Sequence, residues 1–413
     1  MHTEPLTCYR PAPDAARDFA SLPYDVFDTE EARTYLAAHP RSFLAIDRAE
    51  TGFGPGHDPY ADDVYERAAA LLAGRIADGT LVADDVPCYY LYRLEQGGRS
   101  QTGVVAACAA DDYATGAIRR HELTRPEKER DRVRHIRALG CQTGPVFLVH
   151  RDDEALAALV RAHKRSEPLY DFTDGEGVRQ TVWRVDAPEA VGALREALGR
   201  VPRAYIADGH HRAASAVRVC EELRQEHPGA AGAPYEGFLA VLFPESQLRV
   251  LPYNRVVLDT NGLGEEELVG RVREAGFVVG PRQGAPIAPA TRGHFGMYAF
   301  GAWRALELEG PRPEGVVERL DVQILQERVL GPVLGVDDPR TSRRIRFVGG
   351  IEGTAGLERR AGQGGVGLSL CATSVGELMD VADAGLLMPP KSTWFEPKLR
   401  SGLFVRCIAP AGA

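Results

Sequence analysis

Residues 204–223 read AYIADGHHRAASAVRVCEEL, and this stretch predicts a strand, a tight turn and a helix in succession. The apolar run 204–207 is typical of the end of a buried strand, and residues 213–223 are strong helix formers. Between them stands the pentapeptide 208–212, DGHHR. Free backbone N–H groups and the positive end of the helix dipole point outward at such a junction. The pentapeptide therefore predicts an anion site, above all one for phosphate.

Each residue of the pentapeptide has a role in that interpretation. Gly209 lets the backbone approach an anion closely, His210 and His211 can donate hydrogen bonds, and Arg212 offers a bidentate fork. Asp208 either caps the helix or holds Mg²⁺ against phosphate oxygens. The structural alternative is a polar first helical turn with a capping aspartate and two surface histidines. The chain has no G-x-x-x-x-G-K-[ST] motif, so the expected site is not a Walker loop.

A second polar motif, HELTR at residues 121–125, opens a charge-dense segment. Glu122 is a candidate general base, a role that needs a partly desolvated site and a neighbour that orients the carboxylate. His121 and Arg125 are the candidates for that neighbour. The alternative is a solvated charged helix laced by ion pairs between residues three apart.

The third motif lies at residues 388–399, MPPKSTWFEPKL, where three prolines prevent a regular element over most of the stretch. Lys391, Ser392 and Thr393 are candidate contacts to a phosphate or to a substrate carboxylate. The alternative is a proline-stiffened segment that docks on the body of the protein.

A zinc site built from His121, Glu122, His210 and His211 is an alternative to the phosphate site. Residues 121–125 lack the second histidine of H-E-x-x-H, and adjacent histidines point in different directions. The sequence therefore favours a phosphate site. No G-x-S-x-G motif supports a serine hydrolase.

The length of 413 residues predicts more than one domain, and helix and strand signals alternate throughout. We expect a mixed α/β fold with an N-terminal α/β domain at 1–110, a catalytic unit at 111–258 and a C-terminal α/β domain at 259–413. A β-hairpin is expected within 88–108.

Bulk composition narrows the classes of partner. The net charge of −9 disfavours a chain that wraps nucleic acid. Neither an apolar stretch of membrane-spanning length nor a leader is present, so we expect a cytoplasmic protein without a membrane partner. The seven cysteines are scattered without a C-x-x-C pair, which predicts buried reduced thiols.

Motifs spread over nearly the whole chain resemble a bacterial family catalogued mainly as a domain of unknown function. They are LPYDV at 22–26, SQTG at 100–103, HE at 121–122, QTGPV at 142–146, DGHHR at 208–212 and PPKST at 389–393.

The middle unit also resembles the ParB/sulfiredoxin-like fold of free-serine kinases, which include an archaeal ADP-dependent enzyme and a staphylococcal siderophore-pathway enzyme. The shared order is a His-Glu pair, a helix, a Gly-x-Pro strand and an Asp-Gly-His loop at a helix start. This resemblance implies that Glu122 is the base for the serine hydroxyl. His121 and Asp208, the latter helping to place the metal, are the other candidate catalytic residues. The resemblance also implies that residues 208–212, together with Thr143, hold the nucleotide phosphates.

The expected function is therefore a phosphotransferase acting on a small hydroxylated metabolite. Free L-serine, or O-phosphoserine in the reverse direction, is the expected substrate, with ATP or ADP as phosphate partner and Mg²⁺ as cofactor. Two alternatives remain open, a non-catalytic nucleotide-binding ParB-like regulator and a metal-dependent phosphohydrolase.

Overall fold

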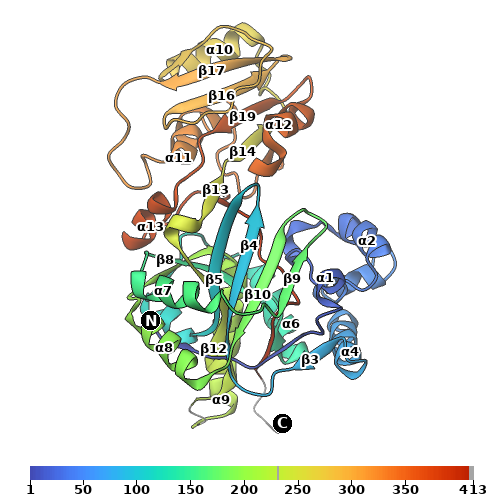
Figure 1. The fold of residues 1–413 in the computed structure, drawn as a ribbon. Helices are drawn as coiled ribbons and strands as arrows, with labels where there is room; N and C mark the ends of the chain where they lie inside the picture. The colour runs from blue at the N-terminus through green and yellow to red at the C-terminus, as the bar shows by residue number, and fades with distance from the viewer. Residues whose placement is uncertain (230–231, 409–413) are drawn as a thin grey trace. The chain divides into compact units, whose positions relative to one another are not determined.

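A computed structural model describes residues 1–229 and 232–408, which form two compact units of mixed α/β structure (Figure 1). The first unit comprises Met1–Leu248 together with the described residues from Pro397 on, and the second comprises Arg249–Glu396. The mixed α/β class expected from the sequence is confirmed. None of the helices in the described ranges combines the length and apolar character needed to cross a membrane.

This division differs from the three domains expected from the sequence. The expected boundary after residue 110 falls inside the first unit, because β5 (Arg99–Ala109) lies in the middle of its sheet. There β5 pairs with β12 (Gly237–Pro244) on one side and β4 (Tyr89–Gln96) on the other. The expected boundary after residue 258 lies a little beyond the end of the first unit at Leu248.

The first unit is built on a mixed nine-stranded sheet with the order β6-β11-β8-β12-β5-β4-β10-β9, and β1 pairs with β5. The expected hairpin is β4–β5, turned by Gly97 and Gly98 at positive φ. The remaining strands are β1 (Thr3–Glu4), β6 (Ile118–Arg119), β8 (Val146–His150), β9 (Tyr170–Thr173), β10 (Arg179–Val185) and β11 (Ala204–Asp208).

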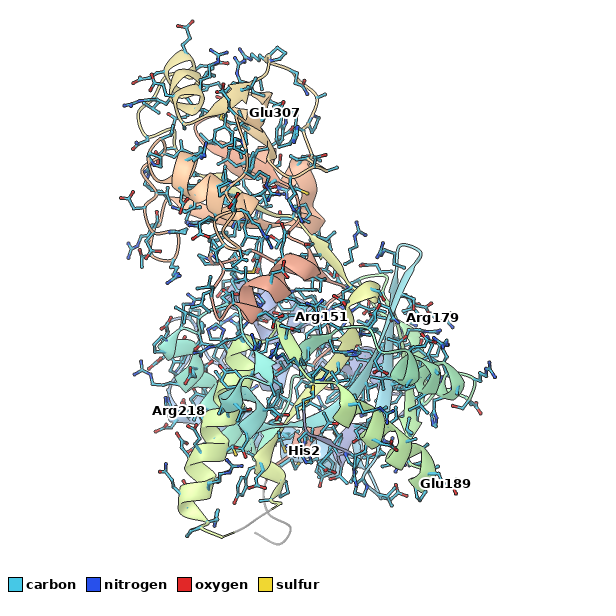
Figure 2. All side chains as sticks on the ribbon, turned by 90° about the vertical axis from the view of Figure 1, so that its left-hand side faces the viewer. His2, Arg151, Arg179, Glu189, Arg218 and Glu307 are labelled. Carbon is cyan, nitrogen blue, oxygen red and sulfur yellow. The ribbon has the colours of Figure 1, made fainter. Side chains whose placement is uncertain are left out.

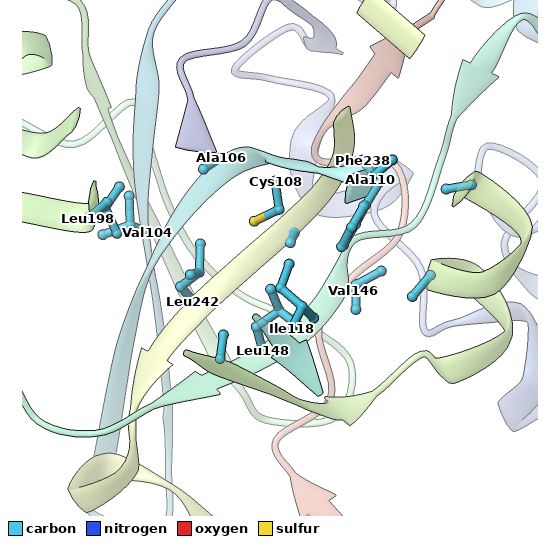
Figure 3. Packing of buried hydrophobic residues seen from close by; sticks show 14 of the residues in the cluster. Val104, Ala106, Cys108, Ala110, Ile118, Val146, Leu148, Leu198, Phe238 and Leu242 are labelled. Carbon is cyan, nitrogen blue, oxygen red and sulfur yellow. The ribbon is translucent and has the colours of Figure 1, made fainter. Parts of the chain in front are cut away.

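Both faces of this sheet are buried, so its central strands are apolar at nearly every position. On β5, Val104, Ala106 and Cys108 face one core, where they meet Leu242 of β12 and Leu148 of β8 (Figure 3). Five helices contribute to that core: α5 (Ala110–Thr115), α6 (Pro126–Leu139), α7 (Glu154–His163), α8 (Pro188–Arg200) and α9 (His210–Glu226). Charged side chains such as Glu189 on α8 and Arg218 on α9 lie on their outer sides (Figure 2).

The opposite face of the sheet meets the C-terminal segment, where Phe404 contacts the rings of Tyr90 and Tyr92 on β4. A four-stranded sheet follows, in the order β3-β2-β21-β7. All seven cysteines are free, and Cys371 and Cys407 are partly exposed. The part of the first unit around this four-stranded sheet contains β2 (Cys8–Pro11), α1 (Ala16–Phe19), α2 (Thr29–Ala38), α3 (Leu44–Asp47), α4 (Asp62–Ala77), β3 (Leu81–Ala83), β7 (Cys141–Gln142) and β21 (Val405–Cys407).

The second unit has an antiparallel six-stranded sheet with the order β15-β17-β16-β19-β14-β18, and a separate pair, β13 (Arg249–Leu251) with β20 (Trp394–Glu396). Its other elements are β14 (Tyr253–Val257), α10 (Glu265–Glu274), β15 (Phe277–Val279), β16 (His294–Ala299), β17 (Ala302–Leu308), α11 (Asp321–Leu325), β18 (Ile345–Gly349), α12 (Gly353–Ala361), β19 (Val366–Leu370) and α13 (Val375–Asp383).

Candidate functional site

Two motifs that lie far apart in the sequence meet at one edge of the large sheet. The strands β6 and β11 are parallel, with Ala204 opposite Ile118 and Tyr205 opposite Arg119. Parallel strands present their carboxyl ends at the same edge of a sheet, which is where α/β proteins commonly bind ligands. The HELTR motif follows β6, and the DGHHR motif spans the end of β11 and the start of α9. The pairing therefore brings both leading candidate motifs together.

A buried pair of histidines joins these motifs. The rings of His121 and His210 pack edge to face, with centroids 4.5 Å apart and planes at 88°. His121 is 2% exposed and His210 is 8% exposed. Burial lowers the pKa of His121 to about 4, and burial together with His121 lowers the pKa of His210 well below its usual value. Both rings are therefore neutral at neutral pH.

Glu122 completes a cluster with the two histidines. One carboxylate oxygen of Glu122 and one ring nitrogen each of His121 and His210 all lie within 4.8 Å of one another. The expectation that His121 neighbours the candidate base agrees with this geometry. The charged helix that was the alternative for this segment is present only in part. It is α6, which begins at Pro126, so HELTR lies in the loop before the helix.

His211 and Arg125 link the first turns of the two helices. The backbone N–H of Arg125 donates to Nε2 of His211 at 2.9 Å. The exposed guanidinium of Arg125 lies 3.9 Å from the carboxylate of Glu127. In this structure the two residues thus fasten the start of α6 to the start of α9.

The loop at the end of β11 is shaped by a bulge and a glycine. The register between β11 and β8 shifts between Ile206 and Asp208, and such bulges re-aim side chains. Gly209 follows with φ of 92°, a left-handed conformation that favours glycine. The carboxylate of Asp208 accepts the N–H of Gly209 at 3.0 Å. Within the described chain no side chain caps α9, so its first turn remains suited to an anion.

Two cations surround the carboxylate of Asp208. Nζ of Lys398 lies 3.3 Å, and Nη2 of Arg212 lies 3.5 Å, from Oδ2 of Asp208. Burial alone would raise the pKa of Asp208, but Lys398 and Arg212 outweigh burial and hold that pKa well below its usual value. A Mg²⁺ ion on this carboxylate would face both positive charges. The contacts therefore suit an anion shared by Lys398 and Arg212 better than a metal at Asp208.

The side chain of Arg212 runs over two glycines. Nη1 donates to the backbone carbonyl of Pro145. A Cβ atom added at Gly209 would lie 3.0 Å from the guanidinium carbon, and one at Gly144 would lie 3.4 Å from Cδ of Arg212. The absence of a side chain at Gly209 and Gly144 therefore leaves space for the side chain of Arg212.

Arg212 also borders a small cavity in the first unit, with a volume of about 30 Å³. Its apolar lining includes Ile136, Val146 and Phe238, and its polar lining includes Arg132 and Thr143.

A buried polar network forms one wall of the cavity. The hydroxyl of Thr143 donates to Oδ1 of Asp47 at 2.7 Å, and Nε2 of His135 lies 3.9 Å from the same oxygen. The guanidinium of Arg132 pairs with Asp131 at 2.9 Å. Burial and Arg132 together lower the pKa of His135 to about 4. Thr143 thus lines the cavity with its hydroxyl bonded to Asp47, and its expected contact with nucleotide phosphates stays a prediction.

The candidate residues of the third motif, Lys391, Ser392 and Thr393, lie in the second unit. Nζ of Lys391 lies 5.8 Å from the ring centroid of Tyr253, and the hydroxyl of Ser392 donates to the carbonyl of Pro389 at 2.6 Å. Thr393 precedes the short strand β20. These contacts are those expected of a docked, proline-stiffened segment.

Sequence reasoning missed Lys398, Asp47 and Arg132. The lysine stands in the same proline-rich motif as Lys391, but no local pattern distinguishes which of the two reaches Asp208. Asp47 and Arg132 are buried charged residues, which are rare without a partner or a function. In the sequence alone they belong to no recognisable motif.

Comparison with known proteins gives one family and several distant structures. The family model described as "Protein of unknown function (DUF1015)" matches residues 3–323. C-terminally truncated SbnI from Staphylococcus aureus is 14% identical, with a TM-score of 0.39 over 73% of this chain and 87% of that one. A free serine kinase in complex with AMP is 16% identical, with a TM-score of 0.33 over 71% and 86%. A conserved hypothetical protein from Pyrococcus furiosus is 15% identical, with a TM-score of 0.35 over 74% and 95%. No curated protein matches.

Proposed function

This chain belongs to the DUF1015 family of proteins of unknown function, and from its site we propose that it transfers a phosphoryl group between a nucleotide and a small hydroxylated metabolite. The observation that carries this proposal is the loop at the start of α9. Gly209 turns the chain into an uncapped helix of 17 residues, and Arg212 and Lys398 stand beside it. A helix N-terminus with two adjacent cations is suited to phosphate.

Glu122 is the proposed proton acceptor. It lies at the same sheet edge as the phosphate loop, next to the neutral ring of His121. Phosphoryl transfer depends mainly on positioning and on charge stabilisation, so one base beside a phosphate cradle is sufficient machinery. A positioned base contributes about 10²–10⁴ in rate.

Free L-serine is the proposed acceptor, with ATP or ADP as donor. The carboxylate of Asp47 and the guanidinium of Arg212 line the small cavity, and this combination suits the ammonium and carboxylate groups of an amino acid that widens the cavity on binding. The order of the motifs along the chain supports serine among amino acids. Mg²⁺ is proposed to enter with the nucleotide, bound chiefly by its phosphates.

The direct test is to incubate the purified chain with L-serine, Mg²⁺ and either ATP or ADP, and to quantify phosphoserine and the nucleotide product. A thermal-shift panel of nucleotides and amino acids identifies binding partners independently, because ligands of the folded state raise the melting temperature. Equimolar phosphoserine and nucleotide product are expected. A chain that melts at the same temperature with and without every nucleotide would refute the proposal.

A second candidate, a metal-dependent phosphohydrolase, is favoured by the cluster of His121, Glu122 and His210. It predicts release of inorganic phosphate from O-phosphoserine in the absence of nucleotide. The proposed phosphotransferase predicts no release of inorganic phosphate under these conditions. Nucleotide binding without any turnover would instead indicate a ParB-like regulator.

A further inference from the structure

We infer that His121, His210 and Glu122 form a binding site for a divalent transition-metal ion, of which zinc is the best match. This site lies beside the proposed phosphate loop and does not depend on phosphoryl transfer. Two imidazoles and one carboxylate, with a position left for water or substrate, make up the ligand set of catalytic zinc sites.

The first argument is the state of the two histidines. Nδ1 of His121 and Nε2 of His210 are buried, and neither has a hydrogen-bond partner among the described residues. A buried polar atom without a partner is costly, and an ion bound to that atom is one of its common explanations. Both rings are neutral, which is the form that binds metals.

The second argument is the orientation of His121. Its ring donates a hydrogen bond to the backbone carbonyl of Ile206. Since Nδ1 has no partner, the donor is Nε2, and the lone pair of Nδ1 is left for another ligand. Metal-binding histidines characteristically donate their second ring N–H to a carbonyl or carboxylate in this way.

The third argument is distance. The three potential ligand atoms lie within 4.8 Å of one another. Two ligands bound to a tetrahedral zinc ion are roughly 3.3 Å apart, given bond lengths of about 2.0–2.2 Å. Metal binding therefore requires rotations of the rings and of the half-buried Glu122 side chain that bring the ligand atoms closer together. His121 follows β6, which pairs with β11, and His210 is the first residue of α9. The backbone that carries the two histidines is therefore already in place.

The adjacent His211 does not belong to this site, since its Nε2 accepts the N–H of Arg125. The objection that neighbouring histidines rarely share an ion therefore does not apply, because only His210 of the pair is a ligand. A carboxylate bound through one oxygen keeps its second oxygen, so Glu122 remains able to accept a proton in the proposed transfer reaction.

The test is a titration of the chelator-treated full chain with Co²⁺, followed through its visible d–d bands, and competition with Zn²⁺. Equimolar, zinc-displaceable binding that a large excess of Mg²⁺ leaves intact is expected. The variants His121→Asn and His210→Gln should bind at least about tenfold more weakly. His150→Gln is the matched control, a buried histidine on β8 outside the cluster, and should bind as the wild type does.

Circular dichroism establishes that each variant is folded. If a variant unfolds, electron paramagnetic resonance of Cu²⁺ in the wild-type chain decides, because two bound imidazoles give nitrogen couplings. Absence of those couplings, displacement of Co²⁺ by Mg²⁺, or equal affinity in wild type and folded ligand variants would each overturn the site. Metal binding without phosphoserine formation would contradict only the proposed function, and phosphoserine formation without metal binding would contradict only the site.

Discussion

Lys398 reaches Asp208 across 190 residues of sequence, with Nζ 3.3 Å from Oδ2. The second unit, Arg249–Glu396, is inserted in the chain between these two residues. The segment that begins at Pro397 thus completes a site whose other parts lie between residues 121 and 212. This ion pair links the last part of the chain to the proposed phosphate loop.

Lys398→Met should weaken nucleotide binding. A charge-assisted hydrogen bond contributes about 1.5–3 kcal/mol, so the dissociation constant for ADP should rise by roughly 10- to 100-fold. Isothermal titration calorimetry measures this change. Lys128→Met is the control, an exposed lysine on α6 whose amine lies 3.4 Å from the hydroxyl of Tyr60. If the two variants bind ADP equally well, Lys398 does not contact phosphate.

Glu122→Gln should lower the turnover number by about 10²–10⁴ while the dissociation constant for nucleotide changes little. The amide keeps the shape of the side chain but cannot accept the hydroxyl proton. Phosphoserine production by mass spectrometry and ADP binding by calorimetry separate the two effects. Turnover at the wild-type level would remove Glu122 from its proposed role.

Gly209→Ala should both destabilise the chain and displace Arg212. Its φ of 92° disfavours any Cβ atom, and the added carbon would lie 3.0 Å from the guanidinium. A cost of about 1–3 kcal/mol in the free energy of unfolding is expected. Gly192→Ala on α8 is the control, because open space surrounds that helical position, and it should stabilise by up to about 1 kcal/mol. Urea denaturation compares the pair, and an unchanged midpoint for Gly209→Ala would contradict the strained turn.

Thr143→Val should cost about 1–3 kcal/mol of stability, because the buried carboxylate of Asp47 loses its hydroxyl donor. Thr115→Val on α5 removes an exposed hydroxyl and should change stability by less than about 0.5 kcal/mol. Chemical denaturation measures both. Equal effects would show that the bond between Thr143 and Asp47 contributes no net stability.

His135 should make the stability of the chain depend on pH. Its pKa in the folded state is about 4, below its ordinary value of 6.5, so the unfolded chain takes up the proton first as the pH falls. The associated stability is complete above pH 6.5 and is lost towards pH 4, with a slope of up to about 1.4 kcal/mol per pH unit. His135→Gln should reduce this slope in denaturation experiments across that range. An unchanged slope would show that His135 titrates normally.

Local structure was predictable where the pattern of residues is strong. The strand before Asp208 and the helix after it were expected, and β11 and α9 confirm them. The helix begins at His210, before the expected start at residue 213. Gly209 precedes it in a left-handed conformation, which does not continue a right-handed helix. The hairpin β4–β5 was also expected, since Gly97 and Gly98 mark its turn.

The sequence by itself determined that DGHHR stands at a strand-to-helix junction, because strand and helix periodicity act over a few residues. Only the tertiary structure decided that HELTR lies beside it, that Lys398 rather than Lys391 pairs with Asp208, and that β5 belongs with β12 in one sheet. Those outcomes depend on hydrogen bonds and ion pairs between residues far apart in the chain. Such pairing depends on the whole buried core, and no local pattern of residues specifies it.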